Sequence, residues 1–218
     1  MSVHRPVSRW EAGRFELARP STTRNDVRMG RLIYSATASL DGYVNDESGG
    51  FDWAAPDDEV HAHINDRHRD IGPFLHGRRM YETMRFWESP PDGLPPVARD
   101  WAGIWQRAQK VVFSRSLAEP STARTRVERE FDAARLRALL DESQTDAAIG
   151  GAEIAGQALA AGLVDELQLH IVPVVVGGGT SWLPAGIGLE LELLETRRFE
   201  SGFLFARYRV ASTRNRRE

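Results

Sequence analysis

The sequence predicts an α/β fold, a sandwich with a mostly parallel central sheet and an antiparallel edge. Short apolar runs rich in β-branched residues recur along the chain, and most are separated by segments with helical spacing of apolar residues. Strands that alternate with helices are typical of parallel sheets, because parallel neighbours need a long crossover connection. The last two runs instead join through Ser201-Gly202, which predicts a two-residue antiparallel hairpin. No repeat, linker or second domain is indicated, so residues 29–218 are expected to form a single domain.

The first half of this domain begins with a buried strand over residues 31–38. A loop follows over 39–52, since Asp41-Gly42 and Gly49-Gly50 permit positive φ angles. The acidic residues after Pro56 predict the start of a helix, where unpaired backbone N–H groups favour negative charge. The sequence then predicts a brief strand over 73–76, a helix over 78–86, a proline-rich loop over 89–96 and a helix over 97–109.

The second half alternates in the same way. Strands are expected over 110–114 and 146–149, and helices over 131–140 and 152–161. A long strand over 166–176 is expected to break or bulge near Pro173, because proline cannot donate to a strand ladder. The terminal hairpin is expected to pair residues 189–200 with 203–210.

The composition excludes several classes of protein. The net charge of −3 gives no chain-wide basic field, so a nucleic-acid partner is not expected. No window reaches the roughly 18 consecutive apolar residues of a membrane span. The absence of cysteine excludes disulfides, thiolate-bound zinc, iron–sulfur clusters and cysteine nucleophiles. It also fits a reducing compartment, and a cytoplasmic location is the expectation.

The first 28 residues differ from the rest of the chain. Apolar residues are sparse there, without a sustained period, and arginines outnumber acids. We expect a poorly packed extension, with a partner-docking arm as the alternative, and Met29 as the start of the folded unit. The six arginines are Arg5, Arg9, Arg14, Arg19, Arg24 and Arg28.

Two expected strand-to-helix turns carry glycine where the strand ends, at Gly77-Arg78 and at Gly150-Gly151. A helix start offers unpaired N–H groups and about half a positive charge, and glycine lets a phosphate approach that backbone closely. Two such turns at the carboxyl edge of one sheet would hold the two ends of a dinucleotide. The alternative is that these glycines only make tight connections. Neither turn matches G-x-G-x-x-G or G-x-x-x-x-G-K-S/T, which argues against an ordinary Rossmann or P-loop protein.

An ordered set of short segments carries a resemblance to a known family. With this set, residues 30–210 resemble the dihydrofolate reductase-like superfamily, and within it the RibD C-terminal domain, the reductase domain of bacterial riboflavin biosynthesis. The resemblance implies a three-layer sandwich. The segments are residues 32–38, Ser39-Leu40-Asp41-Gly42-Tyr43, Gly77-Arg78-Arg79-Met80-Tyr81-Glu82, Val111-Val112-Phe113-Ser114-Arg115, Ile149-Gly150-Gly151, Leu163-Val164-Asp165-Glu166-Leu167, Pro173 and Gly177-Gly178-Gly179.

The resemblance implies NADPH as cofactor. Arg78 and Arg115 match guanidinium groups near the adenosine 2′-phosphate, which favours NADPH over NADH. Met80 stands where the family has a threonine, so a hydroxyl donor to the pyrophosphate is lost. In dihydrofolate reductases the bond that matches Gly150-Gly151 is cis. The residues to which the resemblance assigns cofactor contacts are Ala36, Thr37, Gly77, Arg78, Arg79, Ser114, Arg115, Gly150, Gly151, Ala152 and Glu153.

The substrate side is implied by the same resemblance. The loop over 41–52, with Asp41, matches a mobile loop that closes over the nicotinamide and excludes water. Trp53 and Asp58 match a tryptophan and the acid that recognises substrate, and Asp58 is the candidate catalytic residue. A carboxyl beside an apolar ring pocket would have a raised pKa and would relay a proton. The alternative is that Asp57, Asp58 and Glu59 only favour the helix start.

The expected activity is transfer of hydride from NADPH to a C=N or C=O carbon of a small heterocyclic substrate. By resemblance, the substrate is the ribosylaminopyrimidine of riboflavin biosynthesis, whose open-chain imine becomes a ribitylamino group. A dihydropteridine or folate reductase is one alternative. A catalytically silent ligand-binding protein of the same fold is the other, and the loss of threonine at Met80 favours it. The family also implies a homodimer that pairs through a sheet edge at 166–176 and the terminal hairpin.

The histidines do not predict a metal site. His61, His63 and His68 lie on one expected helix, but their spacing does not bring all three to one ion. A solvated polar face is the expectation for them. His170 lies between apolar residues of a strand and is expected to be a satisfied core or interface histidine.

Overall fold

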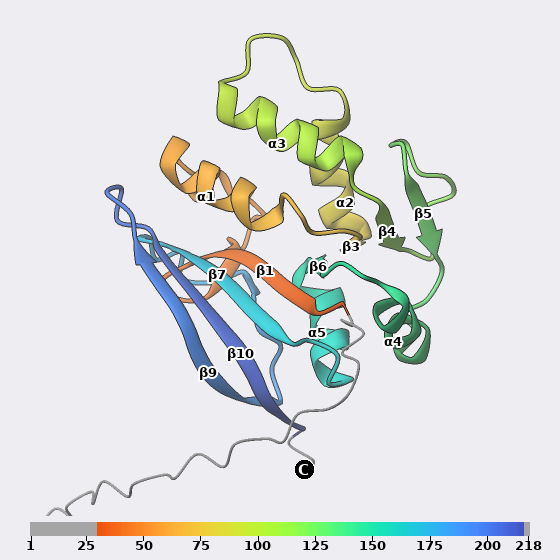
Figure 1. Ribbon diagram of the computed structural model, residues 1–218. Coiled ribbons are helices and arrows are strands. Elements are labelled where there is room, and N and C mark those ends of the chain that lie inside the picture. Colours follow the sequence, from red (N-terminus) through yellow and green to blue (C-terminus); the bar gives the residue numbers. More distant parts are fainter. Residues whose placement is uncertain (1–29, 216–218) are drawn as a thin grey trace, which may run out of the picture.

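The computed structural model describes residues 30–215, and its centre is an eight-stranded sheet (Figure 1). The strands lie in the order β5-β4-β3-β6-β1-β7-β10-β9. Strands β5 through β7 in that order are parallel, and β10 and β9 add an antiparallel edge. The bounds are β1 Leu32–Ser39, β3 Phe74–Gly77, β4 Lys110–Phe113, β5 Thr125–Glu128, β6 Ala147–Gly150, β7 Glu166–Val172, β9 Ile187–Arg198 and β10 Leu204–Asn215. The predicted mostly parallel sheet with an antiparallel terminal hairpin is confirmed.

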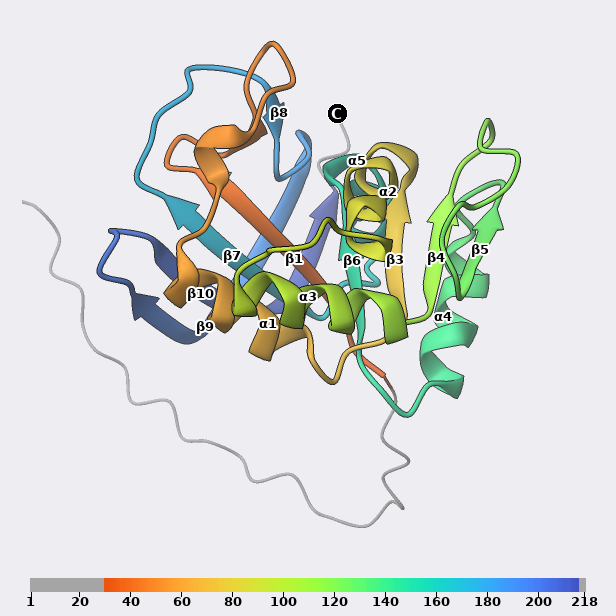
Figure 2. The same ribbon diagram turned by 90° about the horizontal axis from the view of Figure 1, so that it is seen from above.

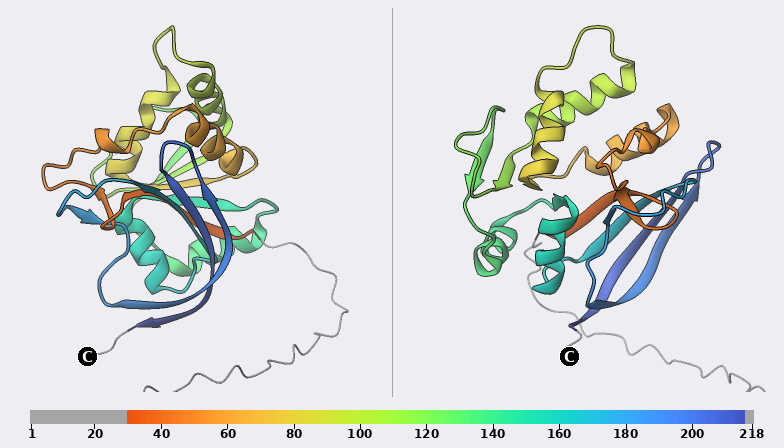
Figure 3. Two further views of the ribbon diagram at one scale, coloured as in Figure 1. Left: turned by 90° about the vertical axis from the view of Figure 1, so that its left-hand side faces the viewer. Right: turned by 180° about the vertical axis from the view of Figure 1, so that it is seen from behind.

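Helices cover both faces of the sheet. In Figure 1, α1 and α3 lie on one face while α4 and α5 lie on the other, which gives the three layers. Figure 3 shows that β9 and β10 form a strongly curved edge beyond the parallel strands. The helices are α1 Asp58–His68, α2 Arg78–Met84, α3 Pro96–Arg107, α4 Ala133–Glu142 and α5 Ala152–Ala160, with short 3-10 turns η1 Asp52–Ala54 and η2 Arg85–Glu88. No described helix is both long and apolar enough to cross a bilayer.

Each face of the sheet has its own core. On the α4 and α5 side, Leu140 and Leu159 pack against Leu32 and Leu75 of the sheet. On the other side, Trp105 of α3 packs on β3 and β4. A third cluster joins α1 to the curved edge through phenylalanines, with Val60 as the α1 contribution. Burial of these side chains on both faces fixes the strand register, since a one-residue slip would move each side chain into the core on the opposite face, where it does not fit.

The helix starts differ in a way that bears on function. Asp57 caps α1 by accepting a hydrogen bond from the Val60 backbone N–H at 2.9 Å, and Asp132 caps α4 in the same manner. Helix α5 instead has Gly151 as its N-cap residue and therefore no side-chain cap. The unpaired N–H groups at its first turn therefore remain open to another acceptor.

The structure differs from the sequence-based expectations at three connections. Strand β5 was not expected, because three of its four side chains are polar and none of the four residues is fully buried. The expected two-residue hairpin is wrong, since the Phe199 N–H donates to the Phe203 carbonyl and encloses Glu200, Ser201 and Gly202. The predicted long strand ends at Val172, before Pro173.

The loop over residues 39–52 is joined to the loop after β7. Strands β2 (Tyr43–Asn45) and β8 (Thr180–Ser181) pair as a small antiparallel sheet. The Asp41 carboxylate accepts hydrogen bonds from the backbone N–H groups of Val176 and Gly177, at 3.2 and 2.8 Å. The hydrogen bond from the Ser39 side chain, together with these two backbone bonds, keeps the Asp41 pKa below its ordinary value.

Gly179 is expected to be essential to this junction. Its φ is +133°, and an added Cβ would overlap the Asn45 carbonyl oxygen. Gly179→Ala should therefore separate the two loops, and we expect the free energy of unfolding to fall by about 2 kcal/mol or more. Chemical denaturation followed by tryptophan fluorescence measures the change. Gly177→Ala, at φ +80° with open space around the added methyl, is the matched control and should cost less. Equal losses in the two variants would contradict this account.

The expected arm over residues 1–28, with Met29, lies outside the described residues.

Candidate functional site

A break in strand pairing opens the centre of the sheet at its carboxyl edge. Strand β1 pairs with β6 only through Leu32, Ile33 and Tyr34, whereas it pairs with β7 along nearly its whole length. Beyond Ile149, β6 turns away into α5, and Figure 2 shows β1 continuing past that point. Ligands in open α/β sheets bind at such carboxyl-edge switch points.

The middle of β1 is partly exposed although the strand is central. Ser35, Ala36 and Thr37 are all half-buried, between fully buried residues on either side. Ala36 packs against the core on the α5 side. The structure therefore places two residues to which the family resemblance assigns cofactor contacts, Ala36 and Thr37, on the part of β1 that pairs with β7 but not with β6.

The two predicted glycine turns lie side by side. Strands β3 and β6 are direct neighbours, and His76 is the Cα partner of Gly150. The backbone nitrogen of Gly77 lies 3.8 Å from the position that a Gly151 Cβ would occupy. Gly151 has φ +100°, a conformation that favours glycine, and it begins the uncapped helix α5. The predicted proximity of the two turns is confirmed.

Gly150 is glycine for a packing reason. A Cβ there would lie 3.1 Å from Nδ1 of His76 and 3.5 Å from Cε of Met80. Nearby side chains thus fill the space, which supports the alternative of a tight connection for this one residue. Among the described residues the cis peptide bond is Gly72–Pro73, so the Gly150–Gly151 bond is trans.

Met80 covers the junction between the turns. Its Cβ lies 3.4 Å from the position of a Gly151 Cβ, and the side chain is half-buried. Methionine has three rotatable side-chain bonds and adapts its shape readily. A ligand that approaches Gly151 must therefore move this side chain.

Arginines surround the same edge. Arg78 pairs with Glu82 one turn along α2, at 2.8 Å, and both side chains are exposed. Arg79 and Arg115 are exposed and have no ion pair within residues 30–215. Surface pairs of the Arg78–Glu82 kind contribute little to stability, so a phosphate would compete for the guanidinium at small cost.

The turn after β4 is held by Ser114 and by Arg129, and sequence reasoning did not identify Arg129. The buried Ser114 hydroxyl accepts hydrogen bonds from the N–H groups of Ser116 and Leu117, at 3.3 and 3.0 Å. Arg129 donates to the Leu117 carbonyl at 2.6 Å and to that of Ala118 at 3.3 Å. These bonds fix the turn that presents Arg115. The sequence carries no local signal for Arg129, because it meets the turn only through the β4–β5 pairing.

The three residues that the resemblance assigns to the substrate, Asp41, Trp53 and Asp58, differ from one another in burial and contacts. Asp58 is exposed in the first turn of α1. Trp53 is partly buried in the cluster under that helix, and its indole nitrogen has no hydrogen-bond partner within residues 30–215. Asp41 is occupied by the loop contacts described above. His61, one turn after Asp58, contacts the Trp87 ring at 6.1 Å between centroids, which places η2 beside α1.

The prediction that the α1 histidines form a solvated polar face needs correction. His63 and His68 are buried, so the expected solvated face is wrong for both. Nδ1 of His63 lies 3.0 Å from Nε2 of His170. His170 is therefore a satisfied core histidine, as predicted. Burial lowers the pKa of His63 to about 4 and that of His170 to about 3. The neutral pair attaches α1 to β7.

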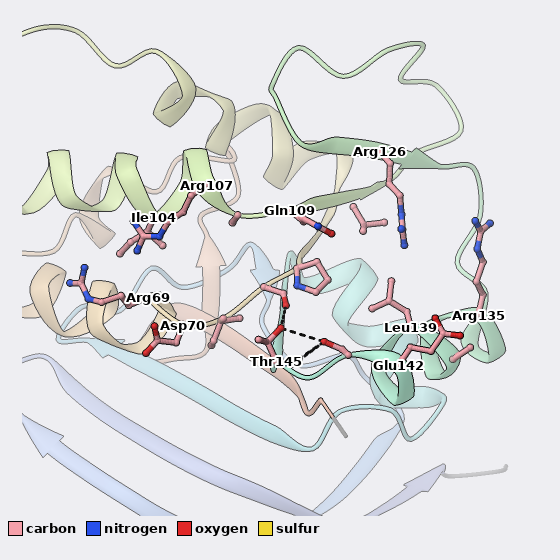
Figure 4. Close-up of a pocket in the computed structure, with 17 residues that line it drawn as sticks. Arg69, Asp70, Ile104, Arg107, Gln109, Arg126, Arg135, Leu139, Glu142 and Thr145 are labelled. Atoms are coloured by element: carbon pink, nitrogen blue, oxygen red, sulfur yellow. Dashed lines mark hydrogen bonds between the residues drawn. The ribbon is translucent and has the colours of Figure 1, made fainter. Parts of the chain in front are cut away.

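A cavity lies elsewhere, at the amino ends of the parallel strands. It has a volume of about 720 Å³, between α3 and α4 (Figure 4). Arg126 and Arg135 reach it, but both pair with Glu128, and Arg69 pairs with Asp100. These three arginines are already paired with acids. The cavity also lies at the amino ends of the parallel strands, whereas open α/β sheets bind ligands at the carboxyl ends, so it is not the candidate site.

A model of the RibD C-terminal domain matches residues 31–205. The chain belongs to the RibD C-terminal domain family. The resemblance inferred from the glycine turns and their flanking strands is thereby confirmed, and so is the fold class. Membership supports an oxidoreductase at the level of the family.

Similar proteins agree with this assignment. YyaP of Bacillus subtilis (strain 168), an uncharacterized protein, is 25% identical over 181 residues, 82% of this chain and 94% of YyaP. A putative riboflavin biosynthesis protein from a Shewanella species superposes with a TM-score of 0.61 at 17% identity, over 84% of this chain and 99% of that one. Acinetobacter baumannii RibD gives a TM-score of 0.65 at 16% identity, over 84% of this chain and 58% of RibD. At these identities the solved structures show a common fold.

Proposed function

We propose that this member of the RibD C-terminal domain family is an NADPH-dependent reductase of a small heterocyclic substrate. The observation that carries the proposal is the position of the uncapped Gly151 turn beside the half of β1 that does not pair with β6. That arrangement combines free N–H donors, a backbone without a side chain and an open sheet edge at one place.

The residues present fit NADPH. The first turn of α5, with Gly151, Ala152 and Glu153, would receive the pyrophosphate through backbone N–H groups. Arg79 and Arg115, together with Arg78, would hold the 2′-phosphate, because guanidinium groups bind phosphate in two-point fashion. Ala36 and Thr37 would lie behind the nicotinamide. The bound cofactor would supply the hydride.

The chain's own contribution is alignment and exclusion of water. The paired loops over 39–52 and 173–182 rise from the carboxyl ends of β1 and β7, and they expose Leu40, Phe51 and Val175. Apolar side chains at that place would cover a bound ring and keep water from the reacting carbon. We assign Asp58 to proton delivery at the substrate, Trp53 to the wall beneath it, and Asp41 to the substrate side through the loop it anchors.

Within this proposal, the preferred substrate is the ribosylaminopyrimidine of riboflavin biosynthesis. A solved relative from Thermotoga maritima is described as a diaminohydroxyphosphoribosylaminopyrimidine deaminase/5-amino-6-(5-phosphoribosylamino)uracil reductase. A dihydropteridine is the rival substrate. A second candidate function is ligand binding without turnover. It is favoured by Met80, which stands where the family has a threonine and covers the turn.

Titration with NADPH, followed by nicotinamide fluorescence, tests the proposal. Wild-type protein should bind NADPH at micromolar concentrations, and NADH less tightly. Arg115→Ala should weaken NADPH binding roughly tenfold and leave NADH unchanged, because only NADPH carries the 2′-phosphate. Arg135→Ala, at the opposite edge of the sheet, is the control. Met80→Thr restores a hydroxyl and should tighten binding.

Absence of NADPH binding at micromolar concentration would contradict the reductase. Tight binding without turnover of any pyrimidine or pterin would favour the binding protein.

We further propose a cytoplasmic homodimer. Strand β7 lies inside the sheet, so the free antiparallel edge is β9, which exposes Leu191 and Leu193. An exposed apolar edge strand is a surface for pairing with a second copy. Light scattering should give twice the chain mass of 24.4 kDa, and a value near one chain would contradict the dimer.

A further inference from the structure

We infer that His76 is a positioning residue of the proposed cofactor site, whose neutral imidazole orients the Gly150–Gly151 peptide. This inference rests on the proposed function, and it concerns a residue beneath the turn that does not itself contact the cofactor.

The burial of His76 needs an explanation. The residue is 6% exposed, and within residues 30–215 neither of its buried ring nitrogens has a hydrogen-bond partner. A buried polar group without a partner destabilises a fold. Packing alone does not require an imidazole here, because the ring lies against Trp105, at 5.6 Å between centroids, and against Phe74. An apolar side chain of similar size would satisfy both neighbours.

The imidazole faces the proposed site. Its Nδ1 and Cε1 lie 3.1 and 3.3 Å from the position of a Gly150 Cβ, so the ring occupies the space that the glycine leaves free. Burial lowers the His76 pKa to about 4, against a smaller opposing effect of the Gly150 backbone. The ring is therefore neutral at pH 7, with one nitrogen as donor and the other as acceptor.

The geometry of the Gly150–Gly151 peptide links the position of His76 to the direction of the Gly151 N–H. In a trans peptide the carbonyl oxygen and the following N–H point in opposite directions. An imidazole N–H that draws the Gly150 carbonyl toward β3 turns the Gly151 N–H away from the ring. That N–H has no acceptor among the residues that the structure describes. It joins the unpaired donors at the start of α5, where the pyrophosphate is proposed to bind.

Met80 completes the arrangement. Its Cε lies 3.5 Å from the same Gly150 position, so the side chain covers the turn. The His76 nitrogens are consequently shielded from water. The Gly150 backbone already acts weakly on the His76 ring, although the ring nitrogens have no hydrogen bond of normal geometry. When a ligand displaces Met80, this interaction is free to become a full hydrogen bond, which raises affinity.

Two substitutions at His76 test the inference. His76→Leu removes both nitrogens and should leave the melting temperature equal or higher, because no unpartnered polar group remains. It should nevertheless raise the dissociation constant for NADPH at least tenfold. His76→Asn places an amide near the Nδ1 position and should recover binding to within about threefold of wild type. Phe74→Leu, which changes the same packing without touching Gly150, should leave NADPH binding unchanged.

The outcomes separate the two proposals. If wild-type protein binds NADPH and His76→Leu binds it equally well, the positioning role is overturned and the reductase stands. If wild type does not bind NADPH, both are overturned. Nitrogen-15 NMR of wild-type histidines serves if a variant fails to fold. The His76 ring resonances should shift on addition of NADPH while those of His170 stay constant, and an unchanged His76 would overturn the inference.

Discussion

Acidification from pH 7 to pH 4.5 is expected to unfold this protein through its buried histidines. His63, His76 and His170 have folded-state pKa values of about 4, 4 and 3, below the ordinary value of about 6.5. Below pH 6.5 the unfolded chain therefore binds protons that the folded chain does not. The stability that these residues contribute is fully present above pH 6.5 and is lost as the pH falls toward 4.

The expected loss is large. Each proton contributes about 1.4 kcal/mol per pH unit, so three histidines give a slope of up to about 4 kcal/mol per pH unit near pH 5. Over two pH units this is comparable with the total stability of an ordinary domain, about 5–15 kcal/mol. The carboxylates act in another window, because Asp100, with a pKa of about 2 beside Arg69, loses its contribution only below about pH 4.

Urea denaturation at a series of pH values, followed by tryptophan fluorescence, measures this slope. The double variant His63→Leu/His170→Leu replaces the buried pair with apolar side chains. It should remove from the slope the contribution of two of the three histidine protons. A free energy of unfolding that stays constant between pH 7 and pH 5 would show that these histidines are already protonated or accessible in the folded protein.

Asp58→Asn is expected to lower the turnover number roughly 100-fold and to leave NADPH binding within twofold of wild type. The substitution keeps the size of the side chain and removes its ability to exchange a proton, and general acid catalysis contributes about this factor or more. Steady-state kinetics with 5-amino-6-(5-phosphoribosylamino)uracil, or with a dihydropteridine if that is turned over instead, measures the first effect. Fluorescence titration measures the second.

Asp57→Asn is the matched control. It makes the same chemical change one residue earlier, where the side chain caps α1 and asparagine caps equally well. Turnover in this variant should stay near wild type. An equal loss of turnover and of NADPH affinity in Asp58→Asn would instead indicate that Asp58 only supports the helix start, and would remove it from the catalytic assignment.

The sequence predicts the architecture well because the relevant signals are local. Glycine at the ends of β3 and β6, apolar runs in β1 and β7, and Pro173 each act within a few residues of themselves. Strand β5 is missed because three of its four side chains are polar, and the β2–β8 pair is missed because its strands lie more than 130 residues apart. Short polar strands of this kind form only when a neighbour is already in place.

The candidate site is predicted less completely than the fold. The glycine turns and the exposed arginines follow from type and spacing. The burial of His63 does not, because α1 has few apolar residues and the helix buries an imidazole against another imidazole from a distant strand. The sequence predicts His76 only as a strand residue, since nothing local shows that its ring fills the space beside Gly150. Both contacts join residues more than 70 positions apart, so single-sequence periodicity carries no trace of them.

The late insertion of β6 between β1 and β3 has a consequence for biosynthesis. During translation, the ribosome releases β1, β3, β4 and β5 before the strand that separates two of them exists. The nascent chain must therefore keep a gap open or reopen it, and such non-local threading is intrinsically slow. Any binding competence at Gly77 and Gly151 arises only after this insertion. Appearance of ligand affinity during refolding would then report the insertion of β6 rather than an early collapse.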